Sequence, residues 1–163
     1  MKSSCRSDVL TRLLFVVAFA ITLLFAAAAA KAQVDITTTV PLSFGRIAIY
    51  DYNTVGRITV LTNGFYTANA NIAVHDVPQR GEYHITGGPA NSAYTVSLPP
   101  SATLTGPGGT FLLDNFVVTP GVLITDAAGE DDFYISARLQ TQGGGVNYGD
   151  GAYNSTFIVT VAF

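Results

Sequence analysis

Residues 153–163, Tyr-Asn-Ser-Thr-Phe-Ile-Val-Thr-Val-Ala-Phe, carry an apolar or aromatic side chain at every second position, interrupted only by Ser155. A period of two residues is that of a β-strand, whose successive side chains point to opposite faces. The intervening residues are mostly polar or small, so we expect one face of this strand to be buried and the other to be partly wet. A strand this apolar needs a partner.

Residues 34–44 alternate in the same way, with aspartate, threonine and serine between the apolar positions. The apolar positions are Val34, Ile36, Val40, Leu42 and Phe44. We interpret the two segments as the strands whose pairing decides what the molecule does. That pairing is formed either within one chain or between two chains.

The first 32 residues are typical of an export signal. Lys2, Arg6 and Arg12 form a basic start, and residues 13–30 are apolar or small apart from one threonine. Ala30-Lys31-Ala32 fits the small-x-small cleavage pattern, so we predict cleavage before Gln33. An uncleaved anchor stays open as the alternative, because a spanning helix needs about 20 apolar residues.

Removing this signal leaves 131 residues (163 minus 32), a suitable size for one domain, residues 45–163, preceded by the segment 33–44. Four of the eight basic and one of the eleven acidic residues fall in the signal, so the mature net charge is −6 (4 minus 10). This balance argues against nucleic acid or anionic lipid as a partner. The only cysteine is Cys5, in the signal, so stability must come from packing rather than disulfides.

Turn signals rich in glycine and proline divide the mature chain into about eight or nine short strand candidates with no helical period. Between the two terminal segments these candidates are residues 45–50, 56–61, 72–77, 82–86, 93–98, 110–119 and 133–139. The segments 82–86 and 93–98 are expected to be adjacent antiparallel strands, and 65–71 a loop. This spacing predicts an all-β antiparallel sandwich of two sheets.

Side chains suited to catalysis or metal binding are few. His75 and His84, with Asp76 and Glu82 nearby, do not form a ligand set of recognised spacing, so surface imidazoles are favoured. The acidic residues within 126–132 resemble a solvated turn more than a calcium loop. Because no acid, base and nucleophile can be assembled, we predict no enzyme activity, no cofactor and no metal.

Four segments carry a resemblance to known proteins. They are residues 41–45 (PLSFG), 56–60 (GRITV), 94–99 (YTVSLP) and 151–161 (GAYNSTFIVTV). With them the chain resembles a family of exported bacterial proteins known mainly as a domain of unknown function. More distantly it is similar to pilus subunits of the chaperone–usher pathway, including the spore-coat-U-like type. That resemblance implies an immunoglobulin-like antiparallel β-sandwich that lacks one strand, which the N-terminal extension of the next subunit supplies.

The resemblance implies roles for both terminal segments in a surface fibre that polymerises by strand addition. The donor strand would present Val34, Ile36, Val40, Leu42 and Phe44, and the acceptor groove would include Phe157, Val159, Val161 and Phe163. The implied partners are other copies of the chain, a periplasmic chaperone and an outer-membrane usher, with a location from the periplasm to the cell surface or outside it. The sequence departs from the pattern at Ala162, at Ser155 and in lacking a subunit disulfide.

Two other interpretations stay open. In the first, residues 34–44 are simply the first strand of a monomeric sandwich, because terminal strands usually pair within their own chain. In the second, the protein is a monomeric secreted binding module that recognises carbohydrate or another surface through tyrosines. A concave patch that brings Tyr50, Tyr52 and Tyr66 together would favour this second interpretation.

Overall fold

The computed structural model describes residues 33–163, which form one compact unit built only from strands, turns and extended segments. The predicted all-β class is therefore confirmed for these residues, whereas the signal prediction lies outside them. No helix long and apolar enough to cross a membrane occurs in this part of the chain. The strands are β1 (Asp35–Val40), β2 (Ile47–Ile49), β3 (Arg57–Val60), β4 (Tyr66–Ala68), β5 (Ile72–Val74), β6 (Gly81–Thr86), β7 (Thr95–Ser97), β8 (Ser101–Leu104), β9 (Phe111–Thr119), β10 (Asp131–Gln140) and β11 (Thr160–Ala162).

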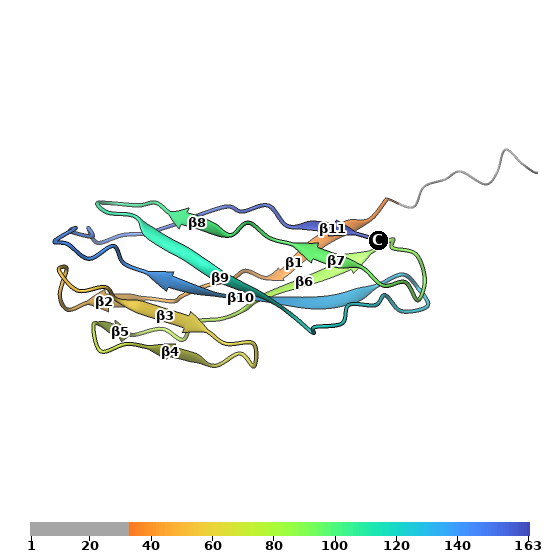
Figure 1. Ribbon diagram of the computed structural model, residues 1–163, viewed down its shortest axis with the longest axis horizontal. Helices are drawn as coiled ribbons and strands as arrows, with labels where there is room; N and C mark the ends of the chain where they lie inside the picture. The colour runs from red at the N-terminus through yellow and green to blue at the C-terminus, as the bar shows by residue number, and fades with distance from the viewer. Residues whose placement is uncertain (1–32) are drawn as a thin grey trace, which may run out of the picture. The chain divides into compact units, whose positions relative to one another are not determined.

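The long strand β10 is the centre of a seven-stranded antiparallel sheet (Figure 1). Along one edge it pairs first with β6 and then with β3, and along the other edge it pairs with β9. Beyond these neighbours, β1 pairs with β6, β4 with β3 and β8 with β9. Apolar side chains alternate along β10, so Phe133, Ile135 and Leu139 are buried beneath the second layer.

Two small sheets, β2–β5 and β7–β11, cover the inner face of the large sheet and complete a sandwich-like fold. Ile47, Ile49 and Val74 of the first small sheet pack on one core cluster, which includes Ile58 and Leu139. Val96 and Val161 of the second pack on another cluster, which includes Ile85 and Phe133. Phe116 and Phe157 contact both clusters, with ring centroids 5.1 Å apart. This aromatic pair joins the two halves of the core.

The strand count and one pairing differ from the prediction. Eleven short strands are present instead of eight or nine, because residues 66–68, expected in a loop, form β4, and residues 101–104, which are not among the candidates, form β8. The expected pair of strands at 82–86 and 93–98 is wrong: β6 has β1 and β10 as neighbours, whereas β7 pairs with β11 in the other layer. Both edges of β6 are already occupied, so the turn at residues 87–89 leads the chain across to the second layer.

Both ends of the described chain meet at one pole of the domain, beside the turn that contains Gly87 and Gly88. The backbone of Gln33 lies against Gly87, and the ring of Phe163 lies against Gly88. At the end of segment 33–44, Gly45 adopts a positive φ of 66° and leaves no room for a Cβ against the carbonyl of Asp76. This corner carries the chain from β1 in the large sheet to β2 in the second layer.

Candidate functional site

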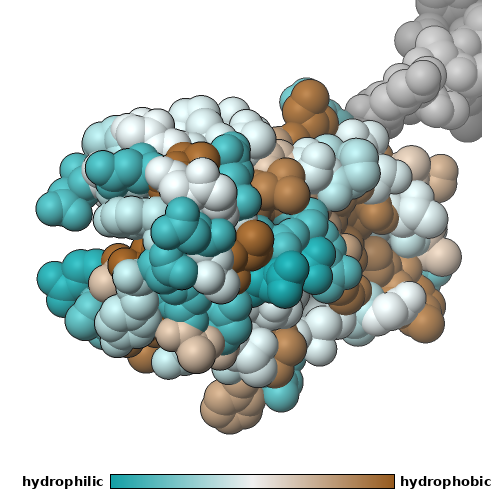
Figure 2. Space-filling model, turned by 60° about the vertical axis from the view of Figure 1, so that its left-hand side comes forward, coloured by the Kyte–Doolittle hydropathy of each residue, from teal (hydrophilic) through white to brown (hydrophobic). Residues whose placement is uncertain are grey.

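An elongated groove separates the first and last segments of the described chain; we call it the terminal groove. Its narrow part has a volume of about 410 Å³ and lies between Ile36 and Leu42 on one side and Phe157 and Val159 on the other. Its wide part, about 980 Å³, continues between residues 41–49 and residues 148–155. Figure 2, which turns the left-hand end of Figure 1 forward, shows a notch between projecting side chains with hydrophobic residues at its base.

The backbone along both walls of the terminal groove lacks one neighbour. β1 is a terminal strand of the large sheet and pairs only with β6 among the described strands. On the opposite wall, the bridge from Asn154 to Thr105 is followed by residues 155–159, which are extended but have no ladder partner within residues 33–163. In Figure 1 the two walls, β1 and the segment leading to β11, run in opposite directions. The second layer is thus interrupted where a further strand would lie.

The floor of the groove is the hydrophobic core itself. Phe111, Leu113 and Leu139, from β9 and β10, line the wide part although each side chain is at most 4% exposed. A complete sandwich covers such residues with a strand of the opposite layer. Here the opening ends at these nearly buried side chains, so an apolar occupant would pack mainly on the partly buried Leu42, Tyr153 and Phe157 above them.

An aromatic cluster closes one side of the wide part. Tyr148 and Tyr153 pack around Phe111, with ring centroids 4.5 and 4.8 Å from it. The Tyr148 hydroxyl accepts a hydrogen bond from the Gln142 amide at 2.8 Å, and the Tyr153 hydroxyl donates to the carbonyls of Gly149, at 3.0 Å, and Pro107. Partial burial raises the pKa of Tyr153 above its usual value. Both hydroxyls are therefore committed to the fold and the rings present apolar surface.

The groove carries little charge. Arg46 and Asp150 are the charged residues that line its wide part, and none lines the narrow part. Arg46 pairs loosely with Asp76 at 3.5 Å, and both side chains are well exposed. Recognition in this groove must therefore rest on shape, apolar burial and backbone hydrogen bonds.

The residues predicted as a donor strand form one wall of the terminal groove and are engaged in their own chain. Val34 and Ile36 pack against the core cluster of Phe133, while Leu42 packs against the other cluster, where Phe44 is buried. Val40 is half-buried and is not among the side chains that pack on either cluster. β1 pairs with β6 over five residue pairs. A role as donor to another copy stays a prediction.

The predicted acceptor residues divide into two groups. Phe157 and Val159 line the groove, as a strand acceptor requires. Val161 instead lies opposite Val96 in the β7–β11 pair, and Phe163 packs on Tyr94 with ring centroids 5.4 Å apart. The two terminal segments thus form opposite walls of one groove and do not pair directly with each other in the chain.

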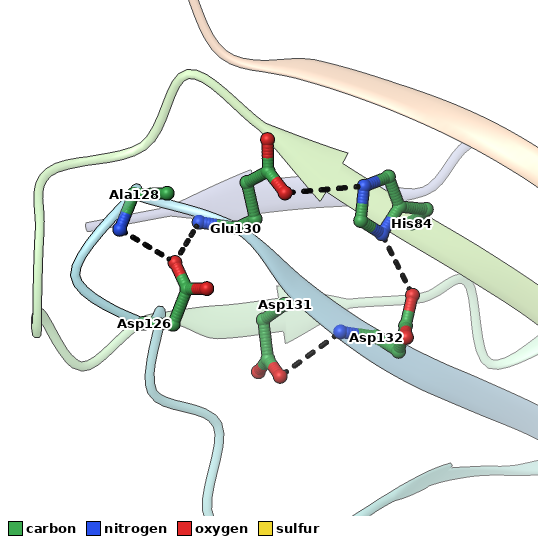
Figure 3. A network of polar contacts seen from close by, with 6 residues as sticks. All are labelled: His84, Asp126, Ala128, Glu130, Asp131 and Asp132. Carbon is green, nitrogen blue, oxygen red and sulfur yellow. Dashed lines mark hydrogen bonds and ion pairs between the residues drawn. The ribbon is translucent and has the colours of Figure 1, made fainter.

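His84 and the acidic residues within 126–132 do not line the terminal groove and lie around the start of β10 (Figure 3). His84 Nδ1 is 2.7 Å from an Asp132 carboxylate oxygen, and Nε2 is 3.9 Å from Glu130. Asp126 accepts hydrogen bonds from the amides of Glu130 and Ala128, which lower the pKa of its carboxyl group. No group of three or more histidine, cysteine or acidic side chains within residues 33–163 is arranged to hold a metal. The Asp126 carboxylate shapes the loop before β10.

The three tyrosines considered for a binding patch are not gathered in the groove. Tyr52 lines the wide part and lies 6.4 Å from Tyr148 between ring centroids, whereas Tyr50 and Tyr66 line neither part of the groove. Tyr50 is 73% exposed. These three tyrosines therefore do not gather in the terminal groove, and carbohydrate recognition stays a prediction.

Sequence reasoning missed several residues of the wide part, notably Ile47, Ile49 and Tyr148. The alternation of Ile47 and Ile49 within residues 45–50 did signal an inward face. No local pattern indicated that this face would lie across an opening from residues 148–155. That relation depends on the missing neighbour strand, which is a property of the whole fold.

Fold and groove together define a class: an antiparallel β-sandwich whose second layer is interrupted between its first and last segments. Within this class, residues 34–163 match the family model described as Domain of unknown function (DUF4402). The chain belongs to this family, as the resemblance in its sequence indicated. No curated protein and no solved structure matches the chain.

Proposed function

We propose that this protein is an exported structural subunit of a cell-surface fibre or pilus-like assembly whose copies are joined by β-strand addition at the terminal groove. The observation that carries the proposal is the interrupted second layer, where core residues Phe111, Leu113 and Leu139 line an open groove. A strand from another copy would find unpaired backbone at residues 155–159 and apolar surface beneath it, and it would gain the edge of β6 that β1 leaves when β1 serves as donor in turn. Strand addition combines backbone hydrogen bonds with alternate side chains that enter pockets.

The donor in this proposal is segment 34–44 of another copy. Full burial of a valine, leucine, isoleucine or phenylalanine side chain stabilises by about 1.5–3 kcal/mol, so five would contribute on the order of 8–15 kcal/mol before ordering costs. In its own chain Phe44 is already buried and the other four are half-buried. Exchange between copies therefore gains only the free energy of burying the parts of these side chains that are still exposed, together with that of covering the groove floor.

Release of the donor requires the five β1–β6 pairs and the two backbone hydrogen bonds between Ser43 and Gln79 to open while β2 keeps its place. The corner at Pro41–Gly45 is suited to this, since Pro41 has no amide hydrogen to lose and Gly45 adopts a positive φ. Because Val40 contacts neither core cluster, it can be changed with little effect on its own domain. Val40 is therefore the best donor position for a test.

The proposal predicts that two complementary variants fail alone and succeed together. Val40→Asp removes an apolar donor side chain and leaves the groove intact, whereas Val159→Asp places a charge in the groove and leaves the donor intact. In size-exclusion chromatography with light scattering on residues 33–163, the unmodified protein should form multimers. Each variant alone should be monomeric, and an equimolar mixture should form dimers.

Two neighbouring substitutions serve as matched controls. Thr39→Asp and Ile158→Asp add the same charge one residue away, at exposed positions, and should leave the multimers unchanged. Circular dichroism verifies that every variant is folded. The proposal would be refuted if the unmodified protein stayed monomeric at high concentration. It would also be refuted if the mixture stayed monomeric while the unmodified protein assembled.

A further inference from the structure

The outer edge of β4 has free backbone groups at alternate residues. The Leu61 amide donates to the Phe65 carbonyl at 2.7 Å, and the Asn69 amide donates to the Arg57 carbonyl at 3.0 Å. With Thr59 opposite Thr67, this alternation turns the backbone groups of residues 65, 67 and 69 toward β3. Those of Tyr66 and Ala68 consequently point away from β3, which is the one strand that pairs with β4 among the described strands, and neither amide donates to a turn or loop carbonyl within residues 33–163.

This edge lacks the features that usually prevent strands from pairing with other molecules. Edge strands are commonly protected by charged residues, proline, bulges or a covering segment. Residues 61–74 contain no charged residue and no proline, and all three residues of β4 are exposed. By contrast β1, at the other end of the sheet order, contains Asp35, is followed by Pro41 and has an irregular register between Thr38 and Val40.

We propose that β4 is a self-pairing edge through which two copies of this chain join antiparallel. A two-fold axis at Thr67 sets Tyr66 of each copy opposite Ala68 of the other. Both residues have outward-pointing backbone groups, so each pair exchanges two hydrogen bonds and the interface forms four. An antiparallel pairing of identical segments is isologous, which makes a second copy the natural partner. The contact would extend the large sheet across the axis.

The length of β4 sets the strength of this contact. Three exposed residues per copy bury far less than the roughly 1,000 Å² of a stable interface, so isolated copies should associate weakly. Phe65, which is 71% exposed beside the strand, adds apolar area. Copies already linked in an assembly meet at high effective concentration, where many weak contacts act together. The β4 edge therefore suits lateral contact between assemblies, although its existence does not depend on the terminal groove.

Amide hydrogen exchange resolved by residue tests the pairing directly in the unmodified protein. Between dilute and concentrated solution, exchange at Tyr66 and Ala68 should slow about five-fold. The Thr67 amide, which faces β3 in the same strand, is an internal control and should not change. Groove-mediated assembly would not protect Tyr66 and Ala68 selectively, so the two proposals can fail independently. Equal exchange at Tyr66 and Ala68 across the concentration range would overturn the inference.

Thr67→Lys provides the second measurement, because it sets two lysines opposite each other at the two-fold axis. Sedimentation velocity should show weaker self-association by about ten-fold, partly restored by salt. The matched control Thr103→Lys adds the same charge at an exposed position of β8 and should have no effect. Ala68→Pro, which removes an outward amide, should act like Thr67→Lys. Association that is unchanged in both β4 variants would refute the β4 pairing.

Discussion

The centre of the large sheet and the terminal groove use the same kinds of side chain but differ in how completely the fold covers them. Phe133 and Ile135 of β10 are fully buried, and their strand has partners along both edges. Phe157 and Val159 alternate just as regularly, yet both are only half-buried and their segment has no ladder partner among the described strands. The difference lies in the neighbours and not in the local sequence.

This difference separates stability from assembly. Side chains at the centre of the sheet contribute to the folding of each copy, because nothing remains to be added around them. Side chains at the groove have unused apolar surface, and covering it requires another strand. Substitutions at the centre of the sheet should therefore lower the free energy of unfolding, whereas substitutions at the groove should mainly prevent assembly.

Phe133→Ala should have the largest effect on stability. The ring is fully buried and stacks on Tyr83 with centroids 5.2 Å apart, so its removal leaves a cavity in the core. We expect a loss of about 3–5 kcal/mol in the free energy of unfolding, measured by urea denaturation. A loss below about 1 kcal/mol would show that the centre of the sheet is not the stabilising region.

Phe157→Ala should lower the free energy of unfolding by less, about 1–2 kcal/mol, because the ring is only half-covered and its main aromatic neighbour is Phe116. Multimer formation should nevertheless be lost, since the ring lines the groove. Urea denaturation and light scattering on the same sample separate the two effects. If stability fell as far as in Phe133→Ala with multimers retained, the distinction between the regions would be wrong.

Asp114→Asn tests the polar outer face of the large sheet. Arg138 donates two hydrogen bonds to Asp114, at 2.8 and 2.9 Å, and these lower the pKa of the carboxyl group. A carboxyl group whose pKa is lower in the folded than in the unfolded state stabilises the folded state above about pH 4. This contribution is lost as the pH falls through the folded-state pKa. Since Arg138 is partly exposed, we expect the variant to lose only about 1 kcal/mol at pH 7.

Urea denaturation of the Asp114 variant at pH 7 and pH 3 completes this test. Its loss relative to the unmodified protein should shrink at the lower pH, because below about pH 4 the carboxyl group of the unfolded state takes up a proton and the advantage of the ionised pair declines. The control Asp76→Asn removes an acid from the exposed pair with Arg46 and should leave the free energy of unfolding unchanged at both pH values. If Asp114→Asn lowered the free energy of unfolding by the same amount at both pH values, the role assigned to the ion pair would be contradicted.

Ile158→Ser should have the smallest effect, although Ile158 lies between Phe157 and Val159. Its side chain is 79% exposed on the opposite face, so the free energy of unfolding should change by less than about 0.5 kcal/mol. Thermal and urea unfolding measure this directly. A large loss would mean that the alternation of faces in this segment has been assigned the wrong way round.

The terminal segments show what a single strand's pattern can predict. The alternation of residues 153–163 indicated that Tyr153, Phe157, Val159 and Val161 share a face, and all four are half-buried while the residues between them are exposed. Yet regular pairing covers only Thr160–Ala162. Alternation reports which face meets apolar surface, whereas the pairing of an edge depends on strands far away in the sequence.

The errors in predicting the other strands have the same cause. Residues 66–68 are all exposed, so β4 has no apolar face for a period of two to reveal. β6 and β7 each alternate, but the turn between them leads to the other layer rather than back along the same sheet. The terminal groove was inferred through a family resemblance. Its wide part, which includes Ile47 and Tyr148, became visible only with the fold.

The meeting of residues 33 and 163 at Gly87–Gly88 has a practical consequence for engineering. A fluorescent protein or an affinity tag fused at either of these residues would be held at the same pole of the domain. In Figure 1 the loops that follow β2 and β10 lie at the opposite pole, and these loops contribute Tyr52 and Tyr148 to the wide part of the groove. A label at either residue therefore leaves the wide part of the groove accessible, whereas the narrow part, lined by Ile36 and Val159, lies close to it; an insertion of the whole domain into a host loop needs only a short pair of linkers.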